Sequence, residues 1–259
     1  MSFLQTKEPI VSVVIACRNG EKYVREALNS ALNQNVSLEI VFVDDFSDDN
    51  TPEILADYIS KYDNIIYVRN DSNIGVAMSR NKGVSIAKGK YIAFLDADDI
   101  WCNDKISRQI QLMEKLNCDF SYTARELIED NGDETGRIVP VFEKITYDEL
   151  LKTNSIPCSS VVLLRNIAVE FPMQKGNLHE DYLNWLKILR KCKVAYGINE
   201  PLFKYRLSPA GKSRNKLKSA VMTYSVHRKN GSNMFKALLY TYSHLTYGVK
   251  KYLKSYFGR

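Results

Sequence analysis

The feature that most constrains this chain is the alternation of apolar runs and amphipathic stretches over its first hundred residues. Nearly continuous apolar runs are typical of strands covered on both faces, and these runs are residues 10–16, 38–43, 65–68 and 91–95. Apolar residues recur with helical spacing in the intervening segments, residues 23–32, 51–59 and 76–88. Because strands and helices alternate, we predict an α/β fold with right-handed crossovers and a mainly parallel sheet that has helices on both faces.

The pattern changes after residue 100. We expect helices at residues 106–116, 146–153 and 182–189, short strands within 118–145, a strand at 159–164 and strand-like sequence at 193–206. Residues 204–214 contain four Lys and Arg and form either a loop that closes over a ligand or a plain linker. We therefore divide the chain into a domain of residues 1–206 and a C-terminal helical, basic extension of residues 207–259.

Polar residues follow each of the first four expected strands. They are Arg18-Asn19-Gly20, Asp44-Asp45, Asn70-Asp71 and Asp96-Ala97-Asp98-Asp99. Open parallel sheets bind ligands outside the carboxyl ends of their strands, and carboxylates crowded there repel each other unless a cation such as Mg²⁺ or Mn²⁺ lies between them. The alternative is that these acids cap helices and turns. We favour capping for Asp48 and Asp49, weigh the two interpretations equally for residues 44–45, and favour a functional role for residues 96–99.

Several classes of protein are disfavoured. No Gly-x-Gly-x-x-Gly follows the first strand and no Walker-type loop occurs, which argues against a dinucleotide-dependent dehydrogenase, a P-loop NTPase and a nucleotidyltransferase.

The five cysteines form no C-x-x-C pair, and the first residues lack the basic-then-apolar order of a secretory signal. No apolar run is long enough to span a bilayer. We therefore expect a protein of the reducing cytoplasm.

Together these motifs resemble the family 2 glycosyltransferases, which have the GT-A fold. The matching stretches are SVVI at residues 12–15, RNG at 18–20, VDDFSD at 43–48, NIG at 73–75, SRN at 79–81, GKYIAFLDADD at 89–99 and EDY at 180–182. Residues 145–147 and 196–206 resemble the bacterial branch that builds surface polysaccharides, including teichuronic acid and lipopolysaccharide. The resemblance implies an inverting transfer of a hexose or N-acetylhexosamine from a nucleotide-diphosphate donor, with UDP as the expected nucleotide, to a glycan or lipid-linked acceptor.

The resemblance also assigns roles to single residues. It implies that the donor nucleotide is contacted by Ala16, Arg18, Asp45, Arg80 and Asp96. It further implies that Asp98 holds Mg²⁺ or Mn²⁺ on the diphosphate and that Asp181 is the catalytic base. The residues expected at the margin of this site are Asp44, Asn73, Glu180, Tyr205 and Arg206.

Physical chemistry supports the roles of the acids. A departing nucleoside diphosphate gains negative charge that a cation neutralises, and an acceptor hydroxyl attacks readily only when a carboxylate takes its proton. Glu180 and Asp181 begin an expected helix, so the alternative is that both merely interact favourably with its dipole. Adjacent helical residues point about 100° apart, so only one of the two is expected to face the site.

The C-terminal segment has an unusual charge. Residues 201–259 hold 13 Lys and Arg and no Asp or Glu, whereas residues 1–200 hold 23 basic and 30 acidic residues. From Phe235 one helical stripe collects Leu238, Leu239, Tyr242, Leu245, Val249, Tyr252, Leu253 and Tyr256. Such a stripe beside lysines is typical of a helix at an anionic membrane surface, an interpretation that we favour slightly over packing on the domain or on a second subunit. Nucleic-acid binding is not expected, because no reader motif occurs.

Two functional hypotheses follow. The first is a metal-dependent glycosyltransferase of the cytoplasm, with peripheral attachment to the inner face of the cell membrane as a further expectation. The second is a non-catalytic module that binds nucleotide sugars or anchors a complex at the membrane. The presence of Asp45, Asp96, Asp98 and Asp181 together favours the enzyme, because a module without catalysis need not keep the base.

Overall fold

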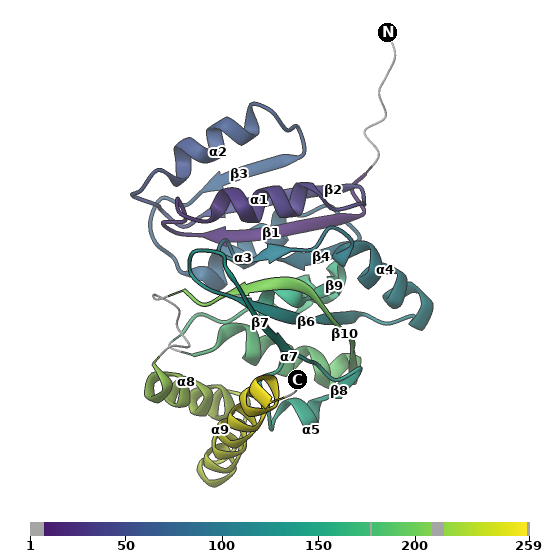
Figure 1. Ribbon diagram of the computed structural model, residues 1–259, viewed down its shortest axis with the longest axis vertical. Coiled ribbons are helices and arrows are strands. Elements are labelled where there is room, and N and C mark those ends of the chain that lie inside the picture. Colours follow the sequence, from purple (N-terminus) through teal and green to yellow (C-terminus); the bar gives the residue numbers. More distant parts are fainter. Residues whose placement is uncertain (1–7, 177, 209–214, 258–259) are drawn as a thin grey trace.

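The first half of the chain forms four parallel strands, as predicted. The computed structural model describes residues 8–176, 178–208 and 215–257 of the 259-residue chain (Figure 1). The strands β1 (Val11–Cys17), β2 (Leu38–Asp44), β3 (Ile65–Arg69) and β4 (Tyr91–Phe94) pair in the order β3-β2-β1-β4. The helices between them are α1 (Val24–Leu32), α2 (Thr51–Ile59) and α3 (Val76–Ile86). All seven elements lie within two residues of their predicted bounds.

The second half of the sheet is mixed. The strand β9 (Val162–Leu164) runs antiparallel between β4 and β6 (Phe120–Ile128), and β10 (Val194–Arg206) runs parallel to β6. Three short strands pair antiparallel at the margins: β5 (Ile100–Trp101) and β8 (Lys144–Thr146) with β10, and β7 (Glu134–Val139) with β6. The helical elements of this half are α4 (Lys105–Leu116), α5 (Tyr147–Leu150), the 3-10 turn Cys158–Ser160, α6 (Arg165–Glu170) and α7 (Glu180–Cys192).

The core is divided into two apolar layers by the sheet. Side chains of α1, α2 and α4 pack on one face, and side chains of α3, α6 and α7 pack on the other. Trp185 of α7 is fully buried, and its ring centroid lies 6.0 Å from that of Phe94 and 5.4 Å from that of Phe120. This packing fixes the start of α7 relative to the end of β4.

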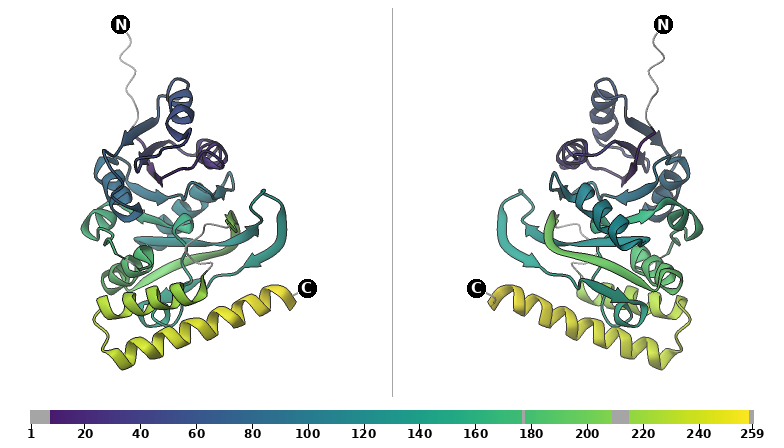
Figure 2. Two further views of the ribbon diagram at one scale, coloured as in Figure 1. Left: turned by 90° about the vertical axis from the view of Figure 1, so that its left-hand side faces the viewer. Right: turned by 90° about the vertical axis from the view of Figure 1, so that its right-hand side faces the viewer.

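The basic tail consists of two helices that lie side by side below the sheet (Figure 2). They are α8 (Lys216–Lys229) and α9 (Met234–Phe257), and α9 also runs along β7. His227 of α8 is fully buried, with its ring 5.7 Å from Tyr182 of α7 and 5.2 Å from Tyr240 of α9. The tail is therefore docked on the domain through an aromatic cluster.

The face that α9 uses for docking differs from the predicted stripe. Ala237 is fully buried and Thr241 is 8% exposed. The predicted apolar residues with described side chains stay in solvent, at 70% exposure for Phe235, 55% for Leu238, 51% for Leu239, 68% for Tyr242 and 42% for Leu245. The alternative in which this part of the stripe packs on the domain is therefore wrong. Described side chains of the tail end at residue 247, so the rest of the stripe lies outside them.

Candidate active site

The loops after β1 and β2 form one wall at the carboxyl end of the sheet. The Asn19 amide donates to Ser47 Oγ at 2.9 Å, and the Asp48 amide donates to Asn19 Oδ1 at 3.0 Å. Ala16 is half-buried near the end of β1, and Arg18 is exposed in the loop that follows. The hydrogen bonds between the two loops therefore fix the backbone that presents both predicted donor residues.

Asp44 is an internal brace of this wall. Its side chain is fully buried, and its carboxylate accepts hydrogen bonds from the Ser47 amide at 2.8 Å and the Tyr67 hydroxyl at 2.9 Å. Burial, followed by the nearby carboxylates of Asp44, Asp49 and Asp98, raises the pKa of the Cys17 thiol at the end of β1. The tips of β1, β2 and β4 therefore share one electrostatic environment.

Asp45 fixes the entry to α3. Its carboxylate accepts hydrogen bonds from the amides of Ile74 and Gly75, both at 2.8 Å, and from Asn70 Nδ2 at 3.0 Å. Gly75 has a φ of 92°, a conformation that glycine adopts without steric cost. Asn73, predicted at the margin, is exposed on the same turn. A carboxylate has about four acceptor positions, so Asp45 keeps capacity for one further donor.

The acidic turn after β4 is held by a residue that the sequence analysis missed. Ser159 Oγ accepts a hydrogen bond from the Asp96 amide at 3.0 Å and donates one to Asp99 Oδ2 at 2.6 Å. Asp99 is 2% exposed, and burial together with the carboxylates of Asp98 and Asp96 raises its pKa well above the usual range. Ser159 therefore sets the conformation of the turn that carries Asp98.

Arg206 braces the same turn from the end of β10. The side chain is 3% exposed, and its Nε donates to the Asp98 carbonyl oxygen at 2.9 Å. Its two Nη atoms donate to the Asp130 carbonyl oxygen at 3.1 Å and to Glu26 Oε2 at 3.0 Å, while its amide donates to Asp99 Oδ1 at 3.1 Å. Arg206, which was predicted at the margin of the site, thus connects the acidic turn to α1 and to the β6–β7 hairpin.

The neighbouring residue, Tyr205, lies beside the acidic turn without a hydrogen bond to it. Its ring lies 5.2 Å from the Arg125 guanidinium, and burial with the nearby charge of Asp99 raises its pKa.

The basic loop was predicted to comprise residues 204–214. Its residues 209–214, including Lys212 and Arg214, lie outside the described residues.

The Asp98 carboxylate is the group best suited to a cation. Burial and the adjacent carboxylate of Asp96 raise the pKa of Asp98 to about 6. No other residue in the described part of the chain donates a hydrogen bond to this carboxylate. The described residues contain no preformed cluster of three metal-binding side chains. Because Mg²⁺ is commonly held by one or two carboxylates plus substrate phosphates, an open site at Asp96 and Asp98 still fits such an ion.

Arg80 connects the acidic turn to the predicted base. This α3 residue is 8% exposed, its guanidinium forms an ion pair with Asp96, and its Nη1 lies 3.9 Å from Met173 Sδ. Burial disfavours the charge of Arg80, but the nearby acidic groups of Cys158, Asp96 and Asp181 hold its pKa above the usual range. The guanidinium therefore lies within the electrostatic reach of both carboxylates.

Asp181 faces the site from the first turn of α7. Burial raises the pKa of this half-buried carboxyl, while the positive charges of Arg80 and His179 oppose the rise. Glu180, the adjacent acid, is 7% exposed and precedes Asp181 at the start of α7. His179 caps the helix, and its Nε2 lies 3.1 Å from Ser219 Oγ of α8. The charge of Arg80 thus acts on Asp96, Asp98 and Asp181, and these four residues form the candidate catalytic rim.

An α/β sheet that joins an Asp-x-Asp turn and an aspartate at a helix start defines a glycosyltransferase of the GT-A type. The family described as Glycosyl transferase family 2 matches residues 12–170. The chain belongs to this family.

Two relatives match nearly the whole chain. TuaG of Bacillus subtilis, a glycosyltransferase assigned by name to teichuronic acid biosynthesis, is 36% identical over 223 residues, which are 86% of this chain and 88% of TuaG. WfgD of Escherichia coli is named as a UDP-Glc:alpha-D-GlcNAc-diphosphoundecaprenol beta-1,3-glucosyltransferase. It is 32% identical over 249 residues, which are 95% of this chain and 96% of WfgD.

Solved structures confirm the predicted fold. TarS 1-349 of S. aureus, crystallised with UDP-GlcNAc, superposes with a TM-score of 0.71 at 20% identity. The superposition covers 88% of this chain and 69% of the TarS chain. The mannosyltransferase PcManGT of Pyrobaculum calidifontis, in complex with GDP-Man and Mn2+, superposes with a TM-score of 0.68 at 16% identity. That superposition covers 92% of this chain and 70% of the PcManGT chain. The predicted family and the GT-A-type α/β architecture are therefore both correct.

Proposed function

We propose that this glycosyltransferase moves a hexose or N-acetylhexosamine from a UDP-linked donor to a lipid-linked glycan, with inversion, during assembly of a bacterial surface polysaccharide. The observation that carries the proposal is the position of Arg80, which pairs with Asp96 and lies within the electrostatic reach of Asp181. One side chain thereby connects the expected donor site to the expected base. The names of TuaG and WfgD support the pathway and the lipid-linked acceptor, and the UDP-GlcNAc complex of TarS supports the nucleotide.

The donor would lie along the wall formed by the first two loops. Ala16 and Arg18 border the nucleotide, and the planar Arg18 guanidinium stacks on the base. Asp45 accepts a base N–H at the acceptor position that its three internal hydrogen bonds leave. Asp96 receives the ribose hydroxyls while Arg80 holds its carboxylate in place. Binding the donor at a prearranged wall lowers the entropic cost of orienting it.

A divalent cation would be held at Asp98, with Asp96 beside it. The ion supplies charge neutralisation for the departing diphosphate. Arg206 fixes the backbone of the turn, and Ser159 fixes the orientation of Asp96 and Asp99, so the Asp98 carboxylate does not have to reorganise when the ion binds. Mg²⁺ and Mn²⁺ both suit these oxygen ligands.

Asp181 would accept the proton of the attacking hydroxyl. Its burial raises the carboxyl pKa, which strengthens it as a base, while the positive charge of Arg80 opposes the rise. Attack on the anomeric carbon from the side opposite the diphosphate forms the new glycosidic bond as the bond to the diphosphate breaks, and this single displacement inverts the configuration.

The tail would hold the enzyme on an anionic membrane. The domain boundary predicted at residue 206 separates the donor wall from helices whose apolar residues are exposed, among them Leu217 at 82%, Phe235 at 70% and Tyr242 at 68%. Residues 201–259 carry 13 basic residues and no acidic residue, so the tail is attracted electrostatically to such a surface. No helix in the part of the chain that the structure describes has both the length and the hydropathy to cross a bilayer. Attachment would therefore be peripheral, at the inner face of the cell membrane.

The catalytic assignment is tested with Asp181→Asn, a change that keeps the shape of the side chain. Transfer from a UDP-sugar to a lipid-linked acceptor should fall by about 10²–10⁴-fold, the usual contribution of a general base. UDP binding, measured as Mn²⁺-dependent thermal stabilisation, should stay unchanged. Asp148→Asn, the same change at an exposed helix start outside the site, serves as the matched control. Full transfer by Asp181→Asn would refute the base.

The same experiment separates the enzyme from a non-catalytic module. A module would bind UDP-sugars with the same affinity in both variants and would neither transfer nor hydrolyse the donor. Membrane attachment is tested independently by co-sedimentation with phosphatidylglycerol vesicles. Leu238→Ser/Leu239→Ser should weaken binding, whereas Val169→Ser, which changes an exposed residue of α6 outside the tail, should not. Equal binding of both variants would refute the tail as the anchor.

A further inference from the structure

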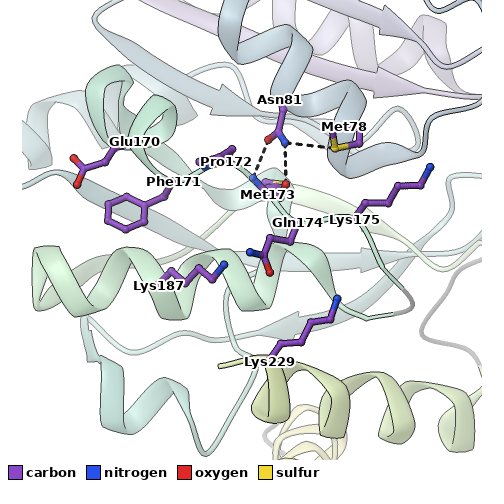
Figure 3. Close-up of a pocket in the computed structure, with 10 residues that line it drawn as sticks. All are labelled: Met78, Asn81, Glu170, Phe171, Pro172, Met173, Gln174, Lys175, Lys187 and Lys229. Atoms are coloured by element: carbon purple, nitrogen blue, oxygen red, sulfur yellow. Dashed lines mark hydrogen bonds between the residues drawn. The ribbon is translucent and has the colours of Figure 1, made fainter. Parts of the chain in front are cut away.

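A hollow of about 620 Å³ opens between α3, the segment after α6, α7 and α8 (Figure 3). Its volume lies within the usual range for small-molecule sites. Three lysines from different elements line it: Lys175 from the segment before α7, Lys187 from α7 and Lys229 from the end of α8. We call it the lysine hollow. A second hollow of about 490 Å³ shares Lys187 and is bordered by Arg190 and Lys191, which extends the basic surface.

The cations of the lysine hollow outnumber its acids. Glu170 is the acidic residue in the lining, and it forms an ion pair with Lys191 outside the hollow. No acidic residue in the described parts of the chain forms an ion pair with Lys175, Lys187 or Lys229. Burial and the positive charges of Arg190 and Lys229 lower the pKa of Lys187. Cations that repel each other in this way are stabilised when an anion binds among them.

Two of the three lysines point into this space. Lys175 extends away from them (Figure 3), and its Cε would lie 3.9 Å from a Cβ placed on Gly75. In Figure 3, Lys187 and Lys229 extend from α7 and α8 toward the segment that carries Gln174 and Lys175. Lys229 Nζ passes so close to the chain that a Cβ placed on Gly176 would lie 3.0 Å from it. The wall opposite is fixed, because Asn81 and Met173 exchange two hydrogen bonds of 2.8 Å.

One residue separates the lysine hollow from the catalytic rim. Met173 lines the hollow, and its sulfur lies 3.9 Å from the guanidinium of Arg80, which pairs with Asp96. On the α7 side, Lys187 follows Asp181 by six residues, a rise of about 9 Å along the helix axis. Because six residues also turn a helix by about 600°, Lys187 lies on a different face of α7 from Asp181. The hollow therefore adjoins the rim through Met173 and Arg80.

We propose that the lysine hollow binds the diphosphate of the lipid-linked acceptor, an inference that rests on the proposed function. The donor diphosphate is assigned to the other side of Arg80, at Asp98, so the two diphosphates occupy separate cation sites. Ammonium groups bind phosphate as point charges, and those of Lys187 and Lys229 match the two negative charges of a diphosphate that is esterified at both ends, as in a lipid-linked sugar. The lipid chain would leave the hollow beside Lys229, at the end of α8 that leads into α9 and its exposed apolar residues (Figure 2).

The test uses octyl diphosphate, which has a diphosphate on an alkyl chain but no sugar, and full-length protein with its donor site saturated by UDP and Mn²⁺. Titration calorimetry should show that Lys187→Gln/Lys229→Gln raises the Kd of octyl diphosphate by at least tenfold. The control is Lys115→Gln/Lys152→Gln, which removes the same charge from exposed positions outside the hollow and should leave this Kd unchanged. The Kd of UDP with Mn²⁺, measured separately, should be unchanged in both.

Each other outcome overturns the proposal in a recognisable way. Equal octyl diphosphate affinity in the wild type and Lys187→Gln/Lys229→Gln would show that the hollow does not bind diphosphate. A parallel loss of UDP affinity would assign the hollow to the donor. Loss of binding to phosphatidylglycerol vesicles with octyl diphosphate binding intact would assign it to a lipid headgroup. Because these measurements need no sugar transfer, they are independent of the outcome of Asp181→Asn.

Discussion

Replacing Ser159 by alanine tests how the acidic turn is held. The substitution removes one oxygen atom from a fully buried site, where it accepts a hydrogen bond from the Asp96 amide and donates one to the Asp99 carboxylate. No other atom of the turn is changed. The effect on stability and on ligand binding therefore reports on this hydroxyl alone.

The magnitude follows from the two bonds. Each of the two hydrogen bonds contributes about 1 kcal/mol, and leaving the Asp96 amide without its acceptor costs about 1 kcal/mol more. Ser159→Ala should thus lower the free energy of unfolding by about 3 kcal/mol, which corresponds to roughly 6–12 °C in Tm for a chain of this size. Because Asp98 lies between the two released residues, the affinity for UDP with Mn²⁺ should fall by about tenfold, or about 1.4 kcal/mol.

The neighbouring serine provides the control. Ser160 is equally buried, but its hydroxyl donates to the Pro157 carbonyl oxygen, a neutral group that also accepts the Ser160 amide. Ser160→Ala should cost about 1 kcal/mol and leave the UDP affinity unchanged. Urea denaturation gives the stability and titration calorimetry gives the affinity. If Ser159→Ala loses no more stability than Ser160→Ala, or keeps its full affinity, the role assigned to Ser159 is wrong.

Three further predictions concern the supports of the fold. Burial and the charge of His244 lower the pKa of His227 from 6.5 to about 4, so the folded state binds fewer protons than the unfolded state between these pH values and stability should fall as the pH drops through this window. His227→Phe should abolish that loss, as measured by urea denaturation at pH 7 and 4.5. Trp185→Ala should cost about 3–5 kcal/mol in the same assay, because it leaves a large cavity under β4. Arg206→Lys keeps the charge but loses the forked hydrogen bonds to Asp98 and Asp130, so it should cost about 2–4 kcal/mol and raise the KM of the donor in a transfer assay.

The strands and helices of the first half were predictable because their signals are local. The runs that became β1 to β4 are apolar on both faces, and that pattern depends only on neighbouring residues. The strand β5 has two residues and α6 has six, too few for a periodic pattern to show. β5 exists because it pairs with β10, which follows a hundred residues later. Such pairing is a property of the folded chain and leaves no mark in a short window of sequence.

The candidate site divides in the same way. The acids Asp96, Asp98 and Asp181 were named from motifs, and in the structure the charge of Arg80 acts on all three. The residues that hold them were found only in three dimensions, because Ser159 acts on Asp99 across 60 residues and Arg206 acts on Asp98 across 108. In the tail, periodicity correctly predicted a helix, but its stripe of large apolar side chains is not the face that contacts the domain. The buried residues of α9 include Ala237 and Thr241 instead.

The position of β10 also has a consequence for synthesis of the chain. This strand is the last to be translated, yet it lies inside the sheet between β6 and β5 and delivers Arg206 to the acidic turn. The four parallel strands can pair while the ribosome is still extending the chain, because their contacts are comparatively local. The acidic turn, by contrast, lacks its hydrogen bonds to Arg206 until this residue has left the exit tunnel, although Ser159 is available earlier. Completion of the turn is thereby delayed until nearly four-fifths of the polypeptide has emerged.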